Sequence, residues 1–290
     1  MKITLFSHCA IDSIKIDTSE YEQIGGAACY GGITARQFKF DVELVTKFGS
    51  DFPYEQYLSD NKIEFKNGLS EKKTTRFLIQ IQGAERNLVL ENQCDEIQYS
   101  STNADGFLVS PIFHEISDET FNQIKKDAKF LFLDPQGFLR RINSEKEIFL
   151  EKTNIDLSGV DAIKVNPEEA FYLTGYSDFE ALKILQKKGV KNAILTNKTE
   201  VSMLVSDRIY SITLPNKKIY DTTGIGDIFC ASFSCTMLKE KDFLWALCFA
   251  GGAAQAALDS KNVGLMKIPK RGAIETNASY LYNLMKYRSI

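Results

Sequence analysis

The chain has 290 residues, of which 44% are hydrophobic and 25% are charged, and its formal net charge is -3. This composition is ordinary for a globular protein, and the small negative charge argues against nucleic-acid binding, which needs a concentrated basic surface. The chain contains only two histidines, which argues against a histidine-based metal site and against a Ser-His-Asp triad.

The sequence also indicates a cellular compartment. None of its apolar runs is long enough to cross a bilayer. Its six cysteines form no C-x-x-C pair, so we expect buried free thiols in a reducing cytosol rather than disulfides or a zinc site. We therefore expect a cytoplasmic protein that binds neither membranes nor nucleic acid.

The N-terminal region begins with two predicted strands and a helix. Residues 2–6 form an apolar run that predicts a buried strand, and residues 12–17 alternate polar and apolar positions, which is the period of a half-exposed strand. A helix-like run rich in small residues follows the pair Gly25-Gly26. The glycine pair would let a ligand approach the backbone closely at the start of this helix.

Residues 63–91 favour β-structure throughout. Two strand-like segments flank a glycine-containing loop at residues 82–86, as in a β-hairpin. Together with residues 12–18, we expect this region to form a small sheet that projects from the main domain. Such a sheet cannot bury both of its faces itself, so it must cover something or pair with a second copy. Phe77 and Ile79 could line a pocket under it, although packing within the sheet is the more common role.

From about residue 105, strand-like and helix-like segments alternate along the chain. This βαβα order predicts a parallel sheet with helices on both faces. Ligands of such sheets bind at the carboxyl ends of the strands. The segments are 106–110, 118–126, 130–133, 162–165, 179–188 and 193–196, followed by strand-like residues 209–214 and 217–220.

Polar side chains stand where several of these strands end. Asp134, Asn166 and Thr196 each follow a strand-like segment, and Asp221 precedes a glycine-rich turn. Their convergence at one edge of the sheet predicts a ligand site there. Asn166 and Glu169 also have a local interpretation, since asparagine is a favoured N-cap and acids stabilise the first turn of a helix.

The most informative stretch reads D-T-T-G-I-G-D-I-F, from Asp221 to Phe229. Gly224-Ile225-Gly226, at the mouth of a helix-compatible run, predicts a turn whose backbone N–H groups bind an anion. Asp227 follows directly, in the position that a base needs to deprotonate a hydroxyl attacking a bound phosphate. A plain tight turn followed by a first-turn carboxylate is the alternative interpretation of the glycines and Asp227.

The string D-T-T-G-I-G-D-x-F resembles the C-terminal signature of the ribokinase-like (PfkB-type) sugar and nucleoside kinases, usually D-T-x-G-A-G-D-x-F. The block from Gly25 to Asp51 resembles the N-terminal signature of the same family. The resemblance spans nearly the whole chain and implies one α/β domain over residues 1–290. This domain has a central, mainly parallel sheet flanked by helices on both faces, and a small projecting β lid from about residues 12–18 and 63–91. In many members the lid is also the dimer contact, so the resemblance allows a homodimer.

The family also implies an activity and a set of site residues. It implies transfer of the γ-phosphate of ATP, with Mg²⁺, to a hydroxyl of a small polyol, which could be a sugar, a nucleoside or a cyclitol. It implies that Asp227 is the catalytic base and that Gly224, Ile225 and Gly226 form the anion hole. The other implied contacts are Asp12, Gly25, Gly26 and Tyr30 to the substrate, Thr196, Thr223, Gly251 and Ala254 to the nucleotide, and Asn166, Glu169 and Asp221 to the metal.

The chain departs from the family's pattern in two places. Tyr30 stands where members that phosphorylate simple sugars usually carry asparagine, which indicates a change of substrate and admits one that stacks on an aromatic ring. Lys198 and Val201 replace the two glycines of the usual T-x-G-x-x-G, which puts the affinity for the nucleotide, or its identity, in question. Arg140, after a segment similar to the family's D-P-N, is a candidate phosphate contact.

Two other functional classes compete with a kinase. A catalytically silent relative that binds a nucleotide or sugar as a sensor would account for the altered loop at residues 196–201, but it has no need to keep both glycines and Asp227. A nicotinamide-dependent dehydrogenase needs G-x-G-x-x-G after the first strand, whereas here residue 229 is Phe and the glycines lie near the C-terminus. We therefore predict a kinase.

Overall fold

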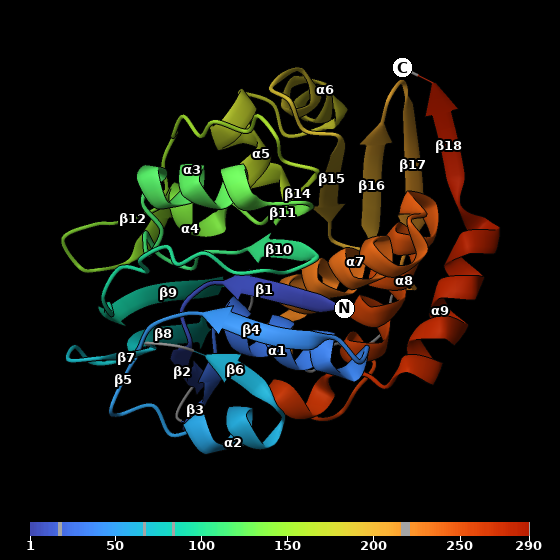
Figure 1. Cartoon of the computed structure of the whole chain (residues 1–290). Helices are drawn as coiled ribbons and strands as arrows, with labels where there is room; N and C mark the ends of the chain where they lie inside the picture. Colours follow the sequence, from blue (N-terminus) through green and yellow to red (C-terminus); the bar gives the residue numbers. More distant parts are fainter. Residues whose placement is uncertain (17–18, 66–67, 83–84, 216–220, 290) are drawn as a thin grey trace.

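The computed structural model describes residues 1–16, 19–65, 68–82, 85–215 and 221–289, and a ten-stranded sheet runs through the centre of this part of the chain (Figure 1). Its strands are β1 (Lys2–Phe6), β4 (Asp41–Val45), β6 (Ile63–Phe65), β10 (Gly106–Val109), β11 (Leu131–Leu133), β14 (Ala162–Val165), β15 (Asn192–Asn197), β16 (Glu200–Val205), β17 (Arg208–Thr213) and β18 (Lys286–Ser289).

The sheet is mainly parallel, as the sequence predicts. Its order is β18-β17-β16-β15-β14-β11-β10-β1-β4-β6. Neighbours from β15 to β6 are parallel, and the pairs among β15, β16, β17 and β18 are antiparallel. The chain runs from β1 to β4 on one side and returns to β10 on the other, so the strand order reverses beside β1. In parallel sheets such a reversal opens a crevice at the carboxyl ends of the strands.

Helices cover both faces of the sheet (Figure 1). One layer contains α1 (Ala27–Gln37), α7 (Ile225–Glu240), α8 (Phe243–Leu258) and α9 (Arg271–Leu284). The opposite layer contains α3 (Asp118–Asp127), α4 (Gln136–Leu139), α5 (Pro167–Thr174) and α6 (Phe179–Lys187). The other helical segments are α2 (Glu55–Asp60) and the 3₁₀ turn η1 (Gly264–Lys267).

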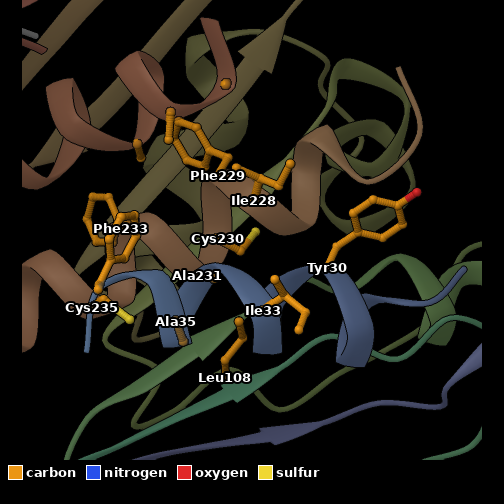
Figure 2. Close-up of a cluster of buried hydrophobic side chains, with 14 of the residues drawn as sticks. Tyr30, Ile33, Ala35, Leu108, Ile228, Phe229, Cys230, Ala231, Phe233 and Cys235 are labelled. Carbon is orange, nitrogen blue, oxygen red and sulfur yellow. The ribbon is translucent and has the colours of Figure 1, made fainter. Parts of the chain in front are cut away.

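Successive residues of the central strands face opposite helix layers, as the two-residue period of a strand requires. In β11, Phe132 packs in the cluster that contains α7, whereas Leu131 and Leu133 pack in the other cluster. The same alternation directs Asp134, which follows β11, and Lys164 of β14 toward the α7 layer. Figure 2 shows this layer, where residues of α1 and α7 pack over β10: Ile33, Leu108, Ile228 and Ala231.

A second sheet forms the predicted lid, with different boundaries. It contains β2 (Ala10–Ile16), β3 (Ser19–Gly25), β8 (Thr75–Gln82) and β9 (Glu85–Asn92), in the order β3-β2-β8-β9. β2 and β8 are parallel, and the other two pairs are antiparallel.

The prediction that the lid begins at residue 63 is wrong, because β6 pairs with β4 in the central sheet. β-propensity predicts a strand but not its partner. β3 was not predicted, and its first four residues are exposed, so they lack the alternating pattern that marks a half-buried strand. Residues 17–18 and 217–220, which we predicted to be extended, lie outside the described part of the chain.

Two small strand pairs complete the structure, β5 (Phe48–Gly49) with β7 (Leu69–Ser70) and β12 (Arg140–Ile142) with β13 (Ile148–Leu150). All six cysteines are buried free thiols, as predicted. Among the described residues, no helix has the length and apolar character that a membrane span requires.

Candidate active site

A cavity of about 190 Å³ lies between the lid and the N-terminus of α7. The lid supplies an apolar wall with Phe77, Ile79 and Leu88, which confirms that Phe77 and Ile79 line a pocket. The main domain supplies most of the polar wall. Of the predicted site residues, Asp12 of the lid strand β2 lines the cavity, as do Gly26, Tyr30, Thr223, Gly224, Gly226 and Asp227 of the main domain. The cavity is also lined by Ala27, Ile112, Asp134, Gln136, Arg140, Lys164 and Thr222.

The glycine turn closes one end of this cavity. Gly224 is the N-cap of α7 and has a left-handed φ of 73°, which glycine adopts without steric cost. The N–H of Ile225 donates to the carbonyl of Thr222 at 3.3 Å. The N–H groups of Gly226 and Asp227 donate to no backbone carbonyl within the described part of the chain, as expected for the first turn of a helix. These two N–H groups can therefore bind an anion, while that of Ile225 already has a partner.

Asp227 lies in the first turn of α7 and lines the cavity. Burial raises the pKa of its carboxyl to about 7, and the nearby Asp134 adds to this effect, while Lys164, Arg140 and Lys267 oppose it. A carboxylate that titrates near neutral pH is a stronger base than an ordinary aspartate and can still be ionised in use. The position and electrostatics of Asp227 both suit a general base.

Lys164 is the site residue that the sequence analysis missed. Its Nζ lies 2.9 Å from Oδ2 of Asp134, and both side chains are nearly buried, at 10% and 1% exposure. A Cβ on Gly226 would lie 3.4 Å from Lys164 Nζ, so the ammonium stands next to the glycine turn. Burial opposes the charge, but Asp134 and Glu169 raise the pKa of Lys164 above its ordinary value. The signal was a lysine within the otherwise apolar segment 162–165, which was predicted to be a strand.

The glycine pair before α1 makes room for Asp12. A Cβ on Gly25 would lie 2.5 Å from the carboxylate of Asp12. Gly26, with φ of 87°, is the N-cap of α1, and a Cβ there would lie 2.4 Å from the carbonyl oxygen of His8. The glycine pair was expected to let a ligand approach the backbone, but in the structure the atoms that approach it belong to Asp12 and His8. The absence of a side chain at Gly25 leaves room for the buried Asp12 carboxylate, which lines the cavity.

Tyr30 lines the cavity, but its ring packs against the glycine turn. A Cβ on Gly224 would be 2.4 Å from carbons of the Tyr30 ring, and the whole side chain is buried. Its hydroxyl points away from the hydrophobic cluster (Figure 2) and has no hydrogen-bond partner in the described structure. Because the ring is covered in this way, it is not free to stack on a substrate.

The predicted magnesium ligands do not gather at one point. Asn166 and Glu169 form a capping box at the start of α5, in which each side chain accepts the other's backbone N–H at 2.8 Å. Asp221 accepts hydrogen bonds from Lys267 Nζ at 2.7 Å and from the N–H of Thr223 at 2.8 Å. An ammonium already neutralises Asp221, so a metal-binding role does not fit this side chain.

The donor set nevertheless fits a magnesium ion that arrives on phosphates. Within the described residues, no three His, Cys, Asp or Glu side chains are arranged to hold a metal ion by themselves. Mg²⁺ usually keeps several waters and binds one or two carboxylates together with substrate phosphates. Glu169 can supply such a carboxylate, since its capping interaction uses only Oε2.

The predicted nucleotide contacts are dispersed. Thr223 lines the cavity, and Thr196 lies at the end of β15, where its hydroxyl donates to the carbonyl of Val165 at 3.4 Å. Gly251 and Ala254 lie in the packed layer of α8. A Cβ on Gly251 would be 2.5 Å from Cδ1 of Ile212 and 3.2 Å from Cδ1 of Leu281, and Ala254 is 3% exposed. In this structure they serve helix packing, which was the alternative role of their small-residue helix.

The altered loop between β15 and β16 keeps one feature that glycine would provide. Lys198 has φ of 53°, in the left-handed region. This region favours glycine, and a lysine adopts it only with strain. Lys198, which replaces the first glycine of the family's pattern, therefore adds a side chain to the loop but keeps a left-handed backbone.

Comparison with known proteins identifies the family. Residues 12–271 match the model of the pfkB family of carbohydrate kinases, so the chain belongs to this family. It is accordingly a phosphotransferase with a hydroxyl group as acceptor, and its relatives are sugar and nucleoside kinases.

Individual relatives are more distant. A cytidine kinase of Thermococcus kodakarensis is 26% identical over 251 residues, which are 80% of this chain and 87% of that protein. A pyrophosphate-dependent kinase of the ribokinase family, solved with a pyrophosphate analogue and myo-inositol, superposes with a TM-score of 0.83 at 22% identity, covering 94% of this chain and 99% of that one. A ribokinase of Arabidopsis thaliana, solved with ribose and ATP, has a TM-score of 0.75 at 18% identity, covering 96% and 98%. These two structures share the fold.

Proposed function

We propose that this protein transfers the γ-phosphate of ATP to a hydroxyl of a sugar, nucleoside or cyclitol, with Asp227 as catalytic base. The observation that carries the proposal is the half-buried Asp227 carboxylate, whose pKa is about 7, at the cavity end closed by the glycine turn. A base with this pKa can take a proton from a hydroxyl at neutral pH.

The reaction divides among the residues of the cavity wall. Asp227 accepts the hydroxyl proton while the acceptor oxygen forms a bond to the γ-phosphorus, and the bond between that phosphorus and the bridging oxygen of ADP breaks. The N–H groups of Gly226 and Asp227, together with the Lys164 ammonium, stabilise the negative charge on the transferred group. Mg²⁺ would supply further charge neutralisation at the donor phosphates, and Glu169 is the carboxylate that could hold it.

The lid face of the cavity combines one carboxylate with apolar side chains. Asp12 is buried and can accept hydrogen bonds from substrate hydroxyls. Phe77, Ile79 and Leu88 lie beside it on the same face of the lid sheet, since Asp12 pairs with Phe77 and Ile79 pairs with Leu88. Their apolar surface suits the C–H face of a sugar or cyclitol, or a nucleobase.

The test is a coupled ADP-release assay with Mg-ATP and a panel of ribose, fructose, adenosine, cytidine, guanosine and myo-inositol. Asp227→Asn should leave acceptor binding nearly unchanged and lower kcat by at least ~100-fold, the scale of positioned acid–base catalysis. Asp178→Asn, at the exposed N-cap of α6, is the matched control and should retain full activity, since asparagine also caps helices. If Asp227→Asn stays within about threefold of the parent, Asp227 is not the base.

The same assay separates the kinase from the silent sensor. Turnover that depends on the acceptor and is lost in Asp227→Asn rules out the sensor. If no acceptor supports turnover but ATP or a panel member binds in calorimetry, the sensor replaces the kinase as the better proposal.

A second candidate phosphoryl donor is inorganic pyrophosphate. The packing around Gly251 favours it, because Ile212 and Leu281 fill the space beside this glycine, where the nucleotide was expected. A donor recognised through its phosphates alone would need only the glycine turn, Lys164 and Mg²⁺. This chemistry matches the donor of the pyrophosphate-dependent kinase that shares the fold.

Phosphorus NMR of the product mixture distinguishes the two donors without a coupling enzyme. Each donor is supplied in turn with the acceptor panel. A phosphomonoester formed from ATP but not from pyrophosphate supports the nucleotide donor, and the reverse result assigns the pyrophosphate donor.

A further inference from the structure

A fully buried lysine lies behind the glycine turn, away from the cavity lining. The side chain of Lys267 is 0% exposed, and its partner Asp221 is 8% exposed. Lys267 Nζ donates to Asp221 Oδ2 at 2.7 Å and to the Asp221 carbonyl oxygen at 3.2 Å. The ammonium belongs to η1, 46 residues further along the chain. Removing two charges from water to this extent has a large free-energy cost. The contacts that the pair makes in the folded protein must offset this cost.

The contacts of Asp221 connect η1 to the glycine turn. Its Oδ1 accepts the N–H of Thr223 at 2.8 Å, and its Oδ2 accepts the N–H of Gly264 at 3.2 Å as well as the Lys267 ammonium. Thr223 directly precedes Gly224, the N-cap of α7. The carboxylate therefore holds the backbone at the entry to the turn, and Lys267 neutralises that carboxylate.

Tyr30 supports the turn from a second direction. Its ring lies against Gly224, and Lys267 Nζ lies 5.8 Å from the centre of the same ring. A cation over an aromatic face at this distance is attracted to it. Lys267 thus contacts both the carboxylate that holds the turn and the ring on which the turn rests.

We propose that Lys267 is a positioning residue for the phosphate-binding turn, whose ammonium holds Asp221 so that the N–H groups of Gly226 and Asp227 stay directed into the cavity. The proposal rests on the proposed kinase function for its kinetic consequences, but not for its structural ones. It has a corollary: after loss of the lysine head group, a small monovalent cation of similar size can enter the vacated space and neutralise Asp221.

The first test is the variant Lys267→Met, which keeps most of the side-chain volume. We expect kcat to fall about tenfold or more, because small misplacements at a reacting centre are costly, while KM for the acceptor changes little. Ammonium or methylammonium chloride should restore kcat in a saturable manner, and tetramethylammonium, which is too large, should not. Lys2→Met is the matched control, since it removes the ammonium from the nearly buried Glu43, 2.8 Å away, at a distance from the cavity. It should keep wild-type kcat with or without added cations.

A second test does not depend on turnover. Amide hydrogen exchange of the segment 221–228 and of Gly264 is measured in the wild type, Lys267→Met and Lys2→Met. Exchange at Thr223 and Gly264 should accelerate in Lys267→Met alone and slow again with ammonium, since both N–H groups donate to Asp221. A folded Lys267→Met with unchanged exchange overturns the proposal, as does one with wild-type kcat. If the wild type phosphorylates no acceptor, the proposed function fails, and the exchange result still decides the role of Lys267.

Discussion

The two lysine–aspartate pairs beside the glycine turn differ in what they face. Lys164 and Asp134 line the cavity, where a ligand can reach them, whereas Lys267 and Asp221 hold the backbone behind the turn. In both pairs the attraction between the charges must offset the cost of removing them from water. The same kind of ion pair therefore serves the ligand on one side of the turn and the backbone on the other. Four predictions test this difference or sharpen it.

Removing the Lys164 ammonium should have the largest effect. Lys164→Met takes a cation from the transferred phosphoryl group and leaves Asp134 charged and nearly buried. We expect kcat/KM to fall about 100-fold, the scale for losing one electrostatic contact to a transition state. Steady-state kinetics measure the loss. Lys191→Met, which breaks the more exposed pair with Asp161, should change activity less than about twofold, because surface ion pairs contribute little. Equal losses in both variants would show that Lys164 has no special role.

Substitution of the two glycines should give unequal results. Gly224→Ala forces a left-handed φ of 73° on alanine and places its Cβ 2.4 Å from the Tyr30 ring. We expect a loss of about 2 kcal/mol in unfolding free energy and about a tenfold loss in kcat. Gly226→Ala meets only Lys164 Nζ, at 3.4 Å, and should cost less than about 1 kcal/mol. Urea unfolding and kinetics of both variants measure the difference, and similar values would contradict the packing of Tyr30 on the turn.

The pH profile should report the titration of Asp227. Its pKa of about 7 means that the base is protonated in acid, so kcat/KM should rise with pH and level off above neutrality. Lys164 lowers the pKa of Asp227, so the midpoint should move to higher pH in Lys164→Met. A wild-type midpoint near pH 4 would mean that Asp227 titrates as an ordinary surface carboxyl.

Asp227 should also lower stability at alkaline pH. Its pKa is raised in the folded state from 3.8 to about 7, so the carboxyl stabilises the fold at low pH, and this contribution is lost as pH rises from about 4 through 7. An asparagine at position 227 carries no charge at any pH, so the variant Asp227→Asn does not lose stability as the pH rises. Its unfolding free energy should exceed that of the wild type by at least about 1 kcal/mol at pH 8 but not at pH 4. Urea unfolding at both pH values provides the measurement. A variant less stable than the parent at pH 8 would contradict the burial of the charge.

The sequence predicts the parts of this site that are local in the chain. Gly224 to Asp227 form one turn and the first turn of a helix, and their spacing alone places N–H groups and a carboxylate together. The strand ends before Asp134 and Asn166 were predictable because apolar runs mark buried strands. Lys164 could have been found in the same way, as a charge inside such a run.

The tertiary structure decided the contacts between residues that are distant in the chain. The sequence shows no relation between Asp221 and Lys267, because their pairing depends on where η1 packs after two intervening helices. Tyr30 suited a stacking role by residue type, but the position of Gly224 above its ring made it a support for the turn. Small residues such as Gly251 permit either a ligand or a neighbouring side chain to approach, and Ile212 and Leu281 fill that space here. Local patterns thus determined the elements and the reactive turn, whereas long-range packing determined which charges are paired, because burial and charge pairing depend on the whole fold rather than on neighbours in sequence.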